Sequence, residues 1–148
     1  IFNTYGPRMN PDDGRSVPNF ITQSLRGEPI TIYGDGSQTR SYCYVSDMVA
    51  GLMAVMFAGP EATGTIFNVG NPDERTIKDF AEVIRDLCGS SSEIKYLPAL
   101  QDDPTRRCPD ITRISTTLGW QPTVTLEEGL KQTIEWFRTK VGASAGAR

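Results

Sequence analysis

The first eight residues constrain the fold of this chain more than any other stretch. Residues 1–2 are apolar and resemble the end of a β-strand that begins before residue 1, and Asn3 and Thr4 are short polar residues where that strand would end. The Gly-Pro pair at residues 6–7 then imposes a turn, because glycine accepts positive φ and proline fixes φ. Ligands of open α/β sheets bind beyond the carboxyl ends of the strands. The segment therefore predicts that Asn3 and Thr4 face a ligand, although an ordinary strand-to-turn junction fits the same spacing.

The composition predicts one globular domain and excludes several classes of partner. Of the 148 residues, 38% are hydrophobic and 22% are charged, and the net charge is −3. Because the sequence has no basic run, we expect no nucleic-acid partner. The longest apolar stretch, residues 48–58, is far shorter than a membrane span, so we expect no membrane contact from this segment.

The cysteines and the lack of histidine limit the chemistry. Cys43, Cys88 and Cys108 form no C-x-x-C pair, which argues against a disulfide framework and against a zinc site, and we expect no metal. Without histidine, acid–base or nucleophilic catalysis by that residue is excluded. Reduced thiols indicate a cytoplasmic location, and the lumen of the endoplasmic reticulum or Golgi would fit if a membrane anchor lay upstream.

Hydrophobic spacing and capping residues predict an α/β order of elements. The predicted strands are residues 30–33, 41–45, 65–69 and 94–96, and the predicted helices are residues 18–27, 46–58, 76–89, 110–119 and 125–141. The helix at 46–58 is apolar on nearly every side, which predicts burial against a sheet. Residues 98–109 read as a charged loop, and residues 142–148 as a disordered tail.

Arg40 is a candidate for binding an anion. The turn Gly34-x-Gly36 lacks the third glycine and the following helix of a dinucleotide fingerprint, so it is predicted to be a tight turn before Arg40. An arginine held on a short strand can make bidentate bonds to phosphate, although a solvated surface arginine fits as well. Arg106 and Arg107 lie in a loop with three aspartates, where local charge compensation is the plainer interpretation.

An ordered series of motifs resembles the extended short-chain dehydrogenase/reductase family of nucleotide-sugar enzymes, and within it the UDP-glucuronate decarboxylases. The motifs are Phe2 to Arg8, Asn10 to Arg15, Val17 to Ile21, Tyr33 to Arg40, Tyr44 to Asp47, Asp102 to Asp110 and Leu118 to Trp120. The resemblance implies an α/β fold in which residues 1–148 are the C-terminal, substrate-binding portion. That portion comprises the last strands of a Rossmann sheet and a small α/β domain.

The resemblance also implies roles for individual residues. A UDP-sugar substrate would be held by Asn3, Asn19, Tyr33, Arg40 and Arg107, the two arginines reaching its diphosphate. Thr4 and Arg15 would lie on the side of the NAD cofactor. In such an enzyme the sugar is oxidised at C4 with NAD, the β-keto acid loses CO₂, and reduction of the ketone gives UDP-xylose. A 4-epimerase, a 4,6-dehydratase and a non-catalytic nucleotide-binding module are the alternatives.

Two features of the resembled family do not occur in this sequence. Its catalytic Tyr-x-x-x-Lys pair has no counterpart, since none of the five tyrosines is followed by lysine four residues on, and no complete Gly-rich fingerprint is present. We therefore expect the NAD-binding half of the enzyme to be absent from this chain. The full-length enzyme is expected to be a homodimer. The chain alone is expected to be inactive and, with unpaired strands and an uncovered apolar helix, marginally stable.

Overall fold

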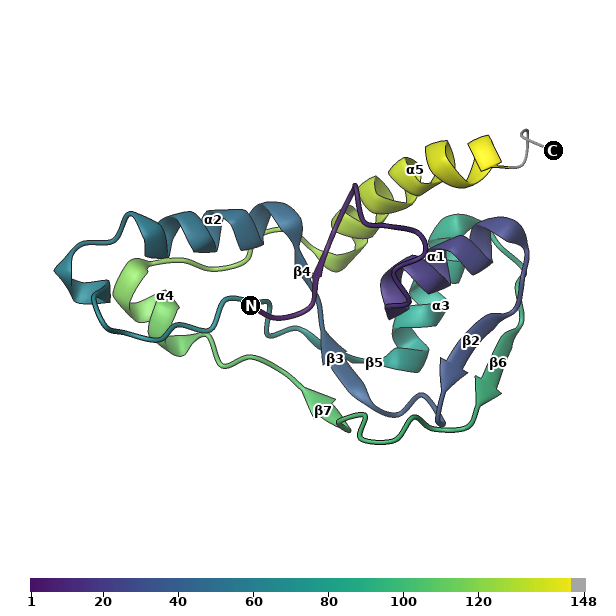
Figure 1. The fold of residues 1–148 in the computed structure, drawn as a ribbon, viewed down its shortest axis with the longest axis horizontal. Helices are drawn as coiled ribbons and strands as arrows, with labels where there is room; N and C mark the ends of the chain where they lie inside the picture. The colour runs from purple at the N-terminus through teal and green to yellow at the C-terminus, as the bar shows by residue number, and fades with distance from the viewer. Residues whose placement is uncertain (145–148) are drawn as a thin grey trace.

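Short strands alternate with helices along the part of the chain that the computed structural model describes, residues 1–144 (Figure 1). The elements are β1 (Thr4–Tyr5), α1 (Ser16–Arg26), β2 (Ile30–Tyr33), β3 (Thr39–Ser41), β4 (Cys43–Tyr44), α2 (Val45–Met56), the 3-10 turn η1 (Pro60–Ala62), β5 (Glu74–Thr76), α3 (Ile77–Cys88), β6 (Ile94–Leu97), β7 (Arg106–Arg107), α4 (Thr112–Leu118) and α5 (Leu126–Ser144). The predicted α/β class is confirmed.

The strands form three small sheets that bring distant segments together. β1 pairs with β4 and β2 pairs with β6, both in parallel. β3 lies between β5, which is antiparallel to it, and β7, which is parallel. In this register Arg40 on β3 is opposite Arg75 on one side and Arg107 on the other. Residues paired in this way point to the same face of a sheet, so the three arginines form a row.

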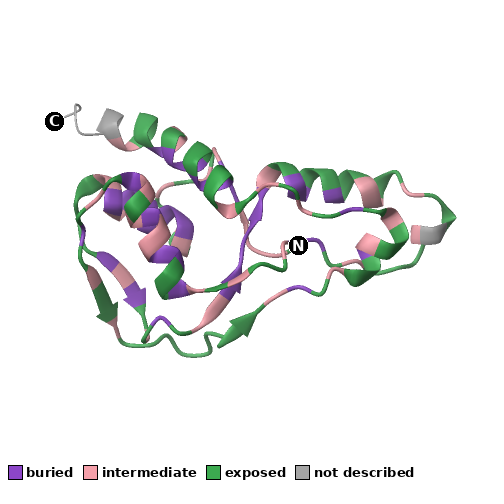
Figure 2. Cartoon of the chain, turned by 180° about the vertical axis from the view of Figure 1, so that it is seen from behind, coloured by how far each residue is buried: buried purple, intermediate pink, exposed green. Residues whose placement is uncertain are grey.

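Two hydrophobic clusters hold the fold. The larger one fills the space between α1, α3, α5 and β2, with Phe20, Phe80 and Phe137 at most 3% exposed. The smaller one lies between α2 and α4 and centres on Met48, Val69, Ile114 and Trp120. Figure 2 shows the buried residues gathered on the three packed helices and the central strands, whereas α2 and α4 extend to one side of them.

Local capping signals place the C-terminal end of α1, both ends of α3 and the start of α5 where the sequence predicts them. α1 and α3 end at Gly27 and Gly89, which have φ of 67° and 65°, values that glycine accepts without strain. Thr76 caps α3 by accepting a hydrogen bond from the Asp79 N–H. Before α5, the Thr125 N–H donates to the Glu128 carboxylate and the Glu128 N–H donates to Thr125 Oγ1, the reciprocal arrangement of a capping box.

Several predicted strands differ from those observed. The first strand is Thr4–Tyr5 rather than residues 1–2, because the parallel ladder to β4 starts at Thr4. The prediction of a strand at 65–69 is wrong, because the segment joins no ladder. Its backbone bonds are a turn bond from the Thr65 N–H to the Ala62 carbonyl and a bond from the Phe2 N–H to the Val69 carbonyl. The predicted strand at 41–45 is split into β3 and β4, and the predicted loop at 98–109 contains β7.

Helix α2 is not buried on all sides as predicted. Met48 and Gly51 face the smaller cluster, but a stripe at helical spacing is exposed. This stripe consists of Val49, Leu52, Met53, Met56 and Phe57, which are between 42% and 76% exposed. The sequence pattern shows only that both faces are apolar, and the described residues cover one of them. No described helix has both the length and the apolarity needed to cross a membrane.

The C-terminal helix is longer than predicted. α5 continues to Ser144, so residues 142–144 of the predicted disordered tail are helical. Residues 145–148 lie outside the described residues.

The two faces of α2 predict different costs for the same substitution. Met48→Ala removes a side chain that is 3% exposed and should lower the free energy of unfolding by about 2–5 kcal/mol. Met53→Ala, at 52% exposure, should change it by no more than about 0.5 kcal/mol. Urea denaturation measures both. Equal losses in the free energy of unfolding would contradict an orientation of α2 in which Met48 is buried and Met53 is exposed.

Candidate functional site

One cavity of about 300 Å³ collects side chains from the first strand, the start of α1, the end of β2 and the adjacent strands β3 and β7. All seven predicted site residues line it: Asn3, Thr4, Arg15, Asn19, Tyr33, Arg40 and Arg107. Their segments are as much as 104 positions apart in the sequence, from Asn3 to Arg107, so the fold alone brings them together. What each one binds remains a prediction.

Arg40 is the buried cation of the cavity. It occupies the centre of β3, is 8% exposed, and donates from Nη1 to the Thr39 carbonyl at 2.7 Å. Its Nη2 donates to Asp103 Oδ1 at 2.5 Å. A buried guanidinium needs such partners because desolvation of an unpaired charge is costly. The Arg40 side chain is therefore fixed in position.

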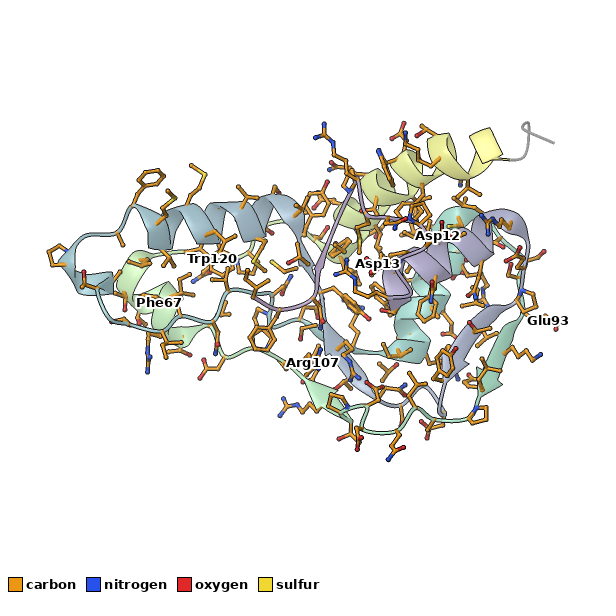
Figure 3. The ribbon with its side chains drawn as sticks, viewed as in Figure 1. Asp12, Asp13, Phe67, Glu93, Arg107 and Trp120 are labelled. Carbon is orange, nitrogen blue, oxygen red and sulfur yellow. The ribbon has the colours of Figure 1, made fainter. Side chains whose placement is uncertain are left out.

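Arg107 differs from Arg40 in being exposed and unpaired. Its side chain makes no hydrogen bond or ion pair with any side chain or backbone group that the structure describes. Its side chain leaves β7 towards the middle of the molecule, on the side where the cavity lies (Figure 3). The preceding Arg106 points to the opposite face and makes a bidentate pair with Glu74. Compensation of Arg106 and Arg107 by the aspartates of their own loop, the plainer interpretation, is therefore wrong.

Asn3 and Thr4 line the cavity with polar groups from the N-terminal segment of the chain. Asn3 has a φ of 28°, in the left-handed region that asparagine tolerates better than most residues. Its Nδ2 donates to the Ser41 carbonyl at 2.9 Å, which leaves its side-chain oxygen as an acceptor. The Thr4 Oγ1 is buried without a hydrogen-bond partner in the described chain. A buried hydroxyl of this kind has an unused donor and acceptor for a bound molecule.

The loop before α1 supplies the opposite wall. Arg15 is the residue before α1, and it is paired with Asp13, to which its Nε donates at 2.7 Å. Asn19 lies one turn into α1 and donates from Nδ2 to the Gly14 carbonyl at 3.0 Å. Asn19 thus holds the loop against the helix, and it also lines the cavity. Figure 3 shows Asp13 at the junction of this loop and α1.

Sequence reasoning missed most of the other residues of the cavity wall, among them Gln38, Asp103 and Tyr42. Gln38 donates to the Tyr33 carbonyl at 2.7 Å, Asp103 pairs with Arg40, and Tyr42 shares a hydrogen bond of 2.8 Å with Ser16. Burial raises the pKa of Tyr42 to about 12, so its hydroxyl stays neutral near pH 7. In the sequence, Tyr42 is an aromatic residue of a predicted strand, and Gln38 and Asp103 lie within motifs of the resembled family that were given no role. The contacts of Gln38 and Asp103 depend on how the loops fold.

The charged residues of the cavity give it a positive balance. Three arginines and one aspartate line it, for a net charge of +2, whereas the whole chain carries −3. Positive charge concentrated in a cleft of an acidic protein favours an anionic ligand. Two arginines on neighbouring strands suit a ligand with two linked phosphates, because guanidinium groups bind phosphate oxygens in pairs.

Comparison with known proteins agrees with this chemistry. Residues 1–133 match the family described as GDP-mannose 4,6 dehydratase. The chain belongs to this family. It is the family of NAD-dependent epimerases and dehydratases, of the extended short-chain dehydrogenase/reductase type, that the ordered motifs predicted. That prediction is confirmed.

Members of the family with curated functions resemble the chain at about half of its positions. UDP-glucuronic acid decarboxylase 1 of Xenopus tropicalis is 52% identical over 141 residues, which are 95% of this chain and 33% of the relative. UDP-glucuronic acid decarboxylase 5 of Arabidopsis thaliana is 54% identical over 142 residues, 96% of this chain and 41% of the relative. The chain thus spans about a third to two fifths of the length of these relatives.

Solved structures of the family share the fold. A UDP-glucose 4-epimerase from Thermotoga maritima, determined with UDP-glucose, is 35% identical with a TM-score of 0.88 and covers 95% of this chain, which spans 45% of it. A UDP-glucuronic acid 4-epimerase from Bacillus cereus, determined with UDP-glucuronic acid and NAD, is 31% identical with a TM-score of 0.87. It covers 94% of this chain, which spans 44% of it.

The pair of Glu74 and Arg106 predicts a pH dependence of stability. Hydrogen bonds from Arg106 lower the pKa of Glu74 from its ordinary 4.5 to about 2. A carboxylate with a lowered pKa stabilises the fold above its unfolded-state pKa, and this stabilisation is lost as the pH falls to the folded-state value. The stability difference between wild type and Glu74→Gln should therefore be constant above about pH 4.5 and disappear near pH 2.

Denaturant titrations across this range measure that difference. In an Arg106→Ala background the difference should be smaller above about pH 4.5, because the main cause of the lowered pKa is removed. A difference that persists unchanged below pH 2 would contradict the assignment.

Proposed function

We propose that this chain is the nucleotide-sugar-binding, C-terminal part of an NAD-dependent UDP-glucuronate decarboxylase that produces UDP-xylose. The observation that carries the proposal is the cavity of net charge +2 lined by all seven residues predicted to bind UDP-sugar or NAD. Identity of 52–54% to UDP-glucuronic acid decarboxylases supports the choice of reaction. The chain spans a minor share of these relatives, so the activity proposed is that of a longer protein.

The diphosphate binds between Arg40 and Arg107. These residues are directly opposite on adjacent strands, which lie about 5 Å apart in a sheet. From that spacing the two long arginine side chains can converge on the linked phosphates of one diphosphate. Arg40 is already fixed by Thr39 and Asp103, whereas Arg107 is free to adjust. The rigid Arg40 can orient the diphosphate, and the adaptable Arg107 can then move to contact it.

The edge of β2 recognises the base. Ile30 and Gly34 direct their backbone N–H groups to β6, so the alternating residues Thr31 and Tyr33 face the cavity side. Side chains already satisfy the Thr31 N–H and the Tyr33 carbonyl. The Thr31 carbonyl and the Tyr33 N–H then present an acceptor beside a donor, the complement of the N–H and carbonyl on the edge of uracil.

Asn3, Thr4 and Arg15 face the sugar and the cofactor. The unpartnered Thr4 hydroxyl and the exposed Arg15 guanidinium fit a bound molecule with phosphates and hydroxyls, as NAD is. When bound, NAD supplies the hydride chemistry at the sugar. This chain's residues hold the nucleotide, and binding energy remote from the reacting carbon serves to position it.

The affinity for UDP, measured by calorimetry, tests the proposed diphosphate site with matched control variants. Arg107→Ala and Arg40→Ala should each weaken binding at least about tenfold, the loss expected for a charge-assisted hydrogen bond. Arg106→Ala and Arg75→Ala remove the same charge from the neighbouring position on β7 and from the strand beside β3, outside the cavity. They should leave the dissociation constant within about threefold.

Circular dichroism must show that each variant is folded. A folded chain that binds no UDP, or loses it equally in all four variants, would contradict the proposed site.

Conversion of UDP-glucuronate tests the proposed reaction. The 148-residue chain alone should convert no UDP-glucuronate, because neither a Tyr-x-x-x-Lys pair nor a Gly-rich fingerprint occurs in it. A longer protein that contains this sequence should release CO₂ and give UDP-xylose with NAD, as measured by the mass of the product. An unchanged mass would indicate 4-epimerisation, and loss of water a 4,6-dehydration. Turnover by the isolated chain would contradict the proposal that this chain binds the nucleotide sugar and contains no catalytic residues.

A further inference from the structure

The row of arginines creates an electrostatic conflict within the sheet. Arg75, Arg40 and Arg107 are at facing positions on β5, β3 and β7. Like charges directly opposite on neighbouring strands destabilise a sheet. Arg75 is paired with Asp73 at 3.1 Å, and Arg107 is unpaired within the described residues. Arg40, in the middle, has a like charge on each side and is also buried, so it has the greatest need of an anion.

Asp103 supplies that anion from within the cavity. Its Oδ1 accepts from Arg40 Nη2 at 2.5 Å, and the two residues are 63 positions apart. The Asp103 side chain is 36% exposed, against 10% for that of Arg40. The carboxylate therefore caps the buried guanidinium on its open side, where a ligand would arrive.

A bound diphosphate, the ligand of the proposed function on which this inference rests, would compete with that carboxylate. It brings negative charge to the Arg40 N–H groups while Asp103 holds one of them. Two anions cannot share this position without strong repulsion, because a partly buried site screens charges weakly. The exposed Asp103 side chain can turn towards solvent, whereas the buried Arg40 cannot move away.

We propose that Asp103 is an affinity-determining residue that occupies Arg40 until a ligand phosphate displaces it. In this arrangement the carboxylate stabilises the arginine row without ligand and sets the strength with which a diphosphate must bind to replace it. A ligand without phosphate, such as uridine, would not disturb the pair.

The test compares Asp103→Asn with Asp102→Asn in UDP binding by calorimetry. Both substitutions remove one negative charge from the same loop, and Asn tolerates the φ of 62° that Asp102 adopts. Asp103→Asn should tighten UDP binding by about tenfold or more, since the competing charge is gone. Asp102→Asn should stay within about threefold of wild type. Uridine should bind all three proteins alike.

A second measurement on the wild type covers the case in which Asp103→Asn does not fold. Backbone amide resonances of residues 101–104 should shift when UDP is added and stay in place with uridine. Weaker UDP binding by Asp103→Asn would show that Asp103 positions Arg40 and would overturn the inference. An equal gain in both variants, or loop resonances indifferent to UDP, would overturn it as well. If no folded form binds UDP, the proposed function itself fails; UDP binding that is indifferent to Asp103 overturns this inference alone.

Discussion

Burial of the Arg40 guanidinium at the centre of the β5-β3-β7 sheet is the constraint on which the rest of the site depends. A buried cation must have anionic or carbonyl partners, and here Thr39 and Asp103 provide them. The strand that carries Arg40 cannot shift by one residue without turning the guanidinium to the opposite face. The register that fixes Arg40 therefore also fixes Arg107 beside it, and with it the side of the sheet that carries the proposed diphosphate site.

The same register gives two adjacent arginines different surroundings. Arg106 and Arg107 are both arginines on β7, yet alternation along a strand sends them to opposite faces. Arg106 meets Glu74 and holds β5 to β7 across β3, whereas Arg107 reaches the cavity. No difference in residue type separates the two roles. The pairing with β3 decides which arginine pairs with Glu74 and which faces the cavity.

Short-range signals explain which parts of the fold could be predicted from the sequence. Helices α1, α3 and α5 end or begin at glycines and Thr-Glu or Thr-Asp caps, whose conformations depend on neighbours three or four residues away. β2 was predicted because its β-branched and aromatic residues need no distant partner to be recognised. The segment 65–69 has a similar composition but no strand beside it to complete a ladder, and composition alone does not show that.

The candidate site also has one part that the sequence indicates and one part that only the fold reveals. Its seven predicted residues came from ordered motifs of a known family, and the structure gathers them in one cavity, which periodicity alone would not have indicated. The pair of Arg40 and Asp103 has no local signal, because it joins a strand to a loop across 63 residues. Charge counting along the sequence assigns Asp103 to the nearest arginines, Arg106 and Arg107. The fold assigns it to the one arginine that is buried, since that is where an anion lowers the free energy most.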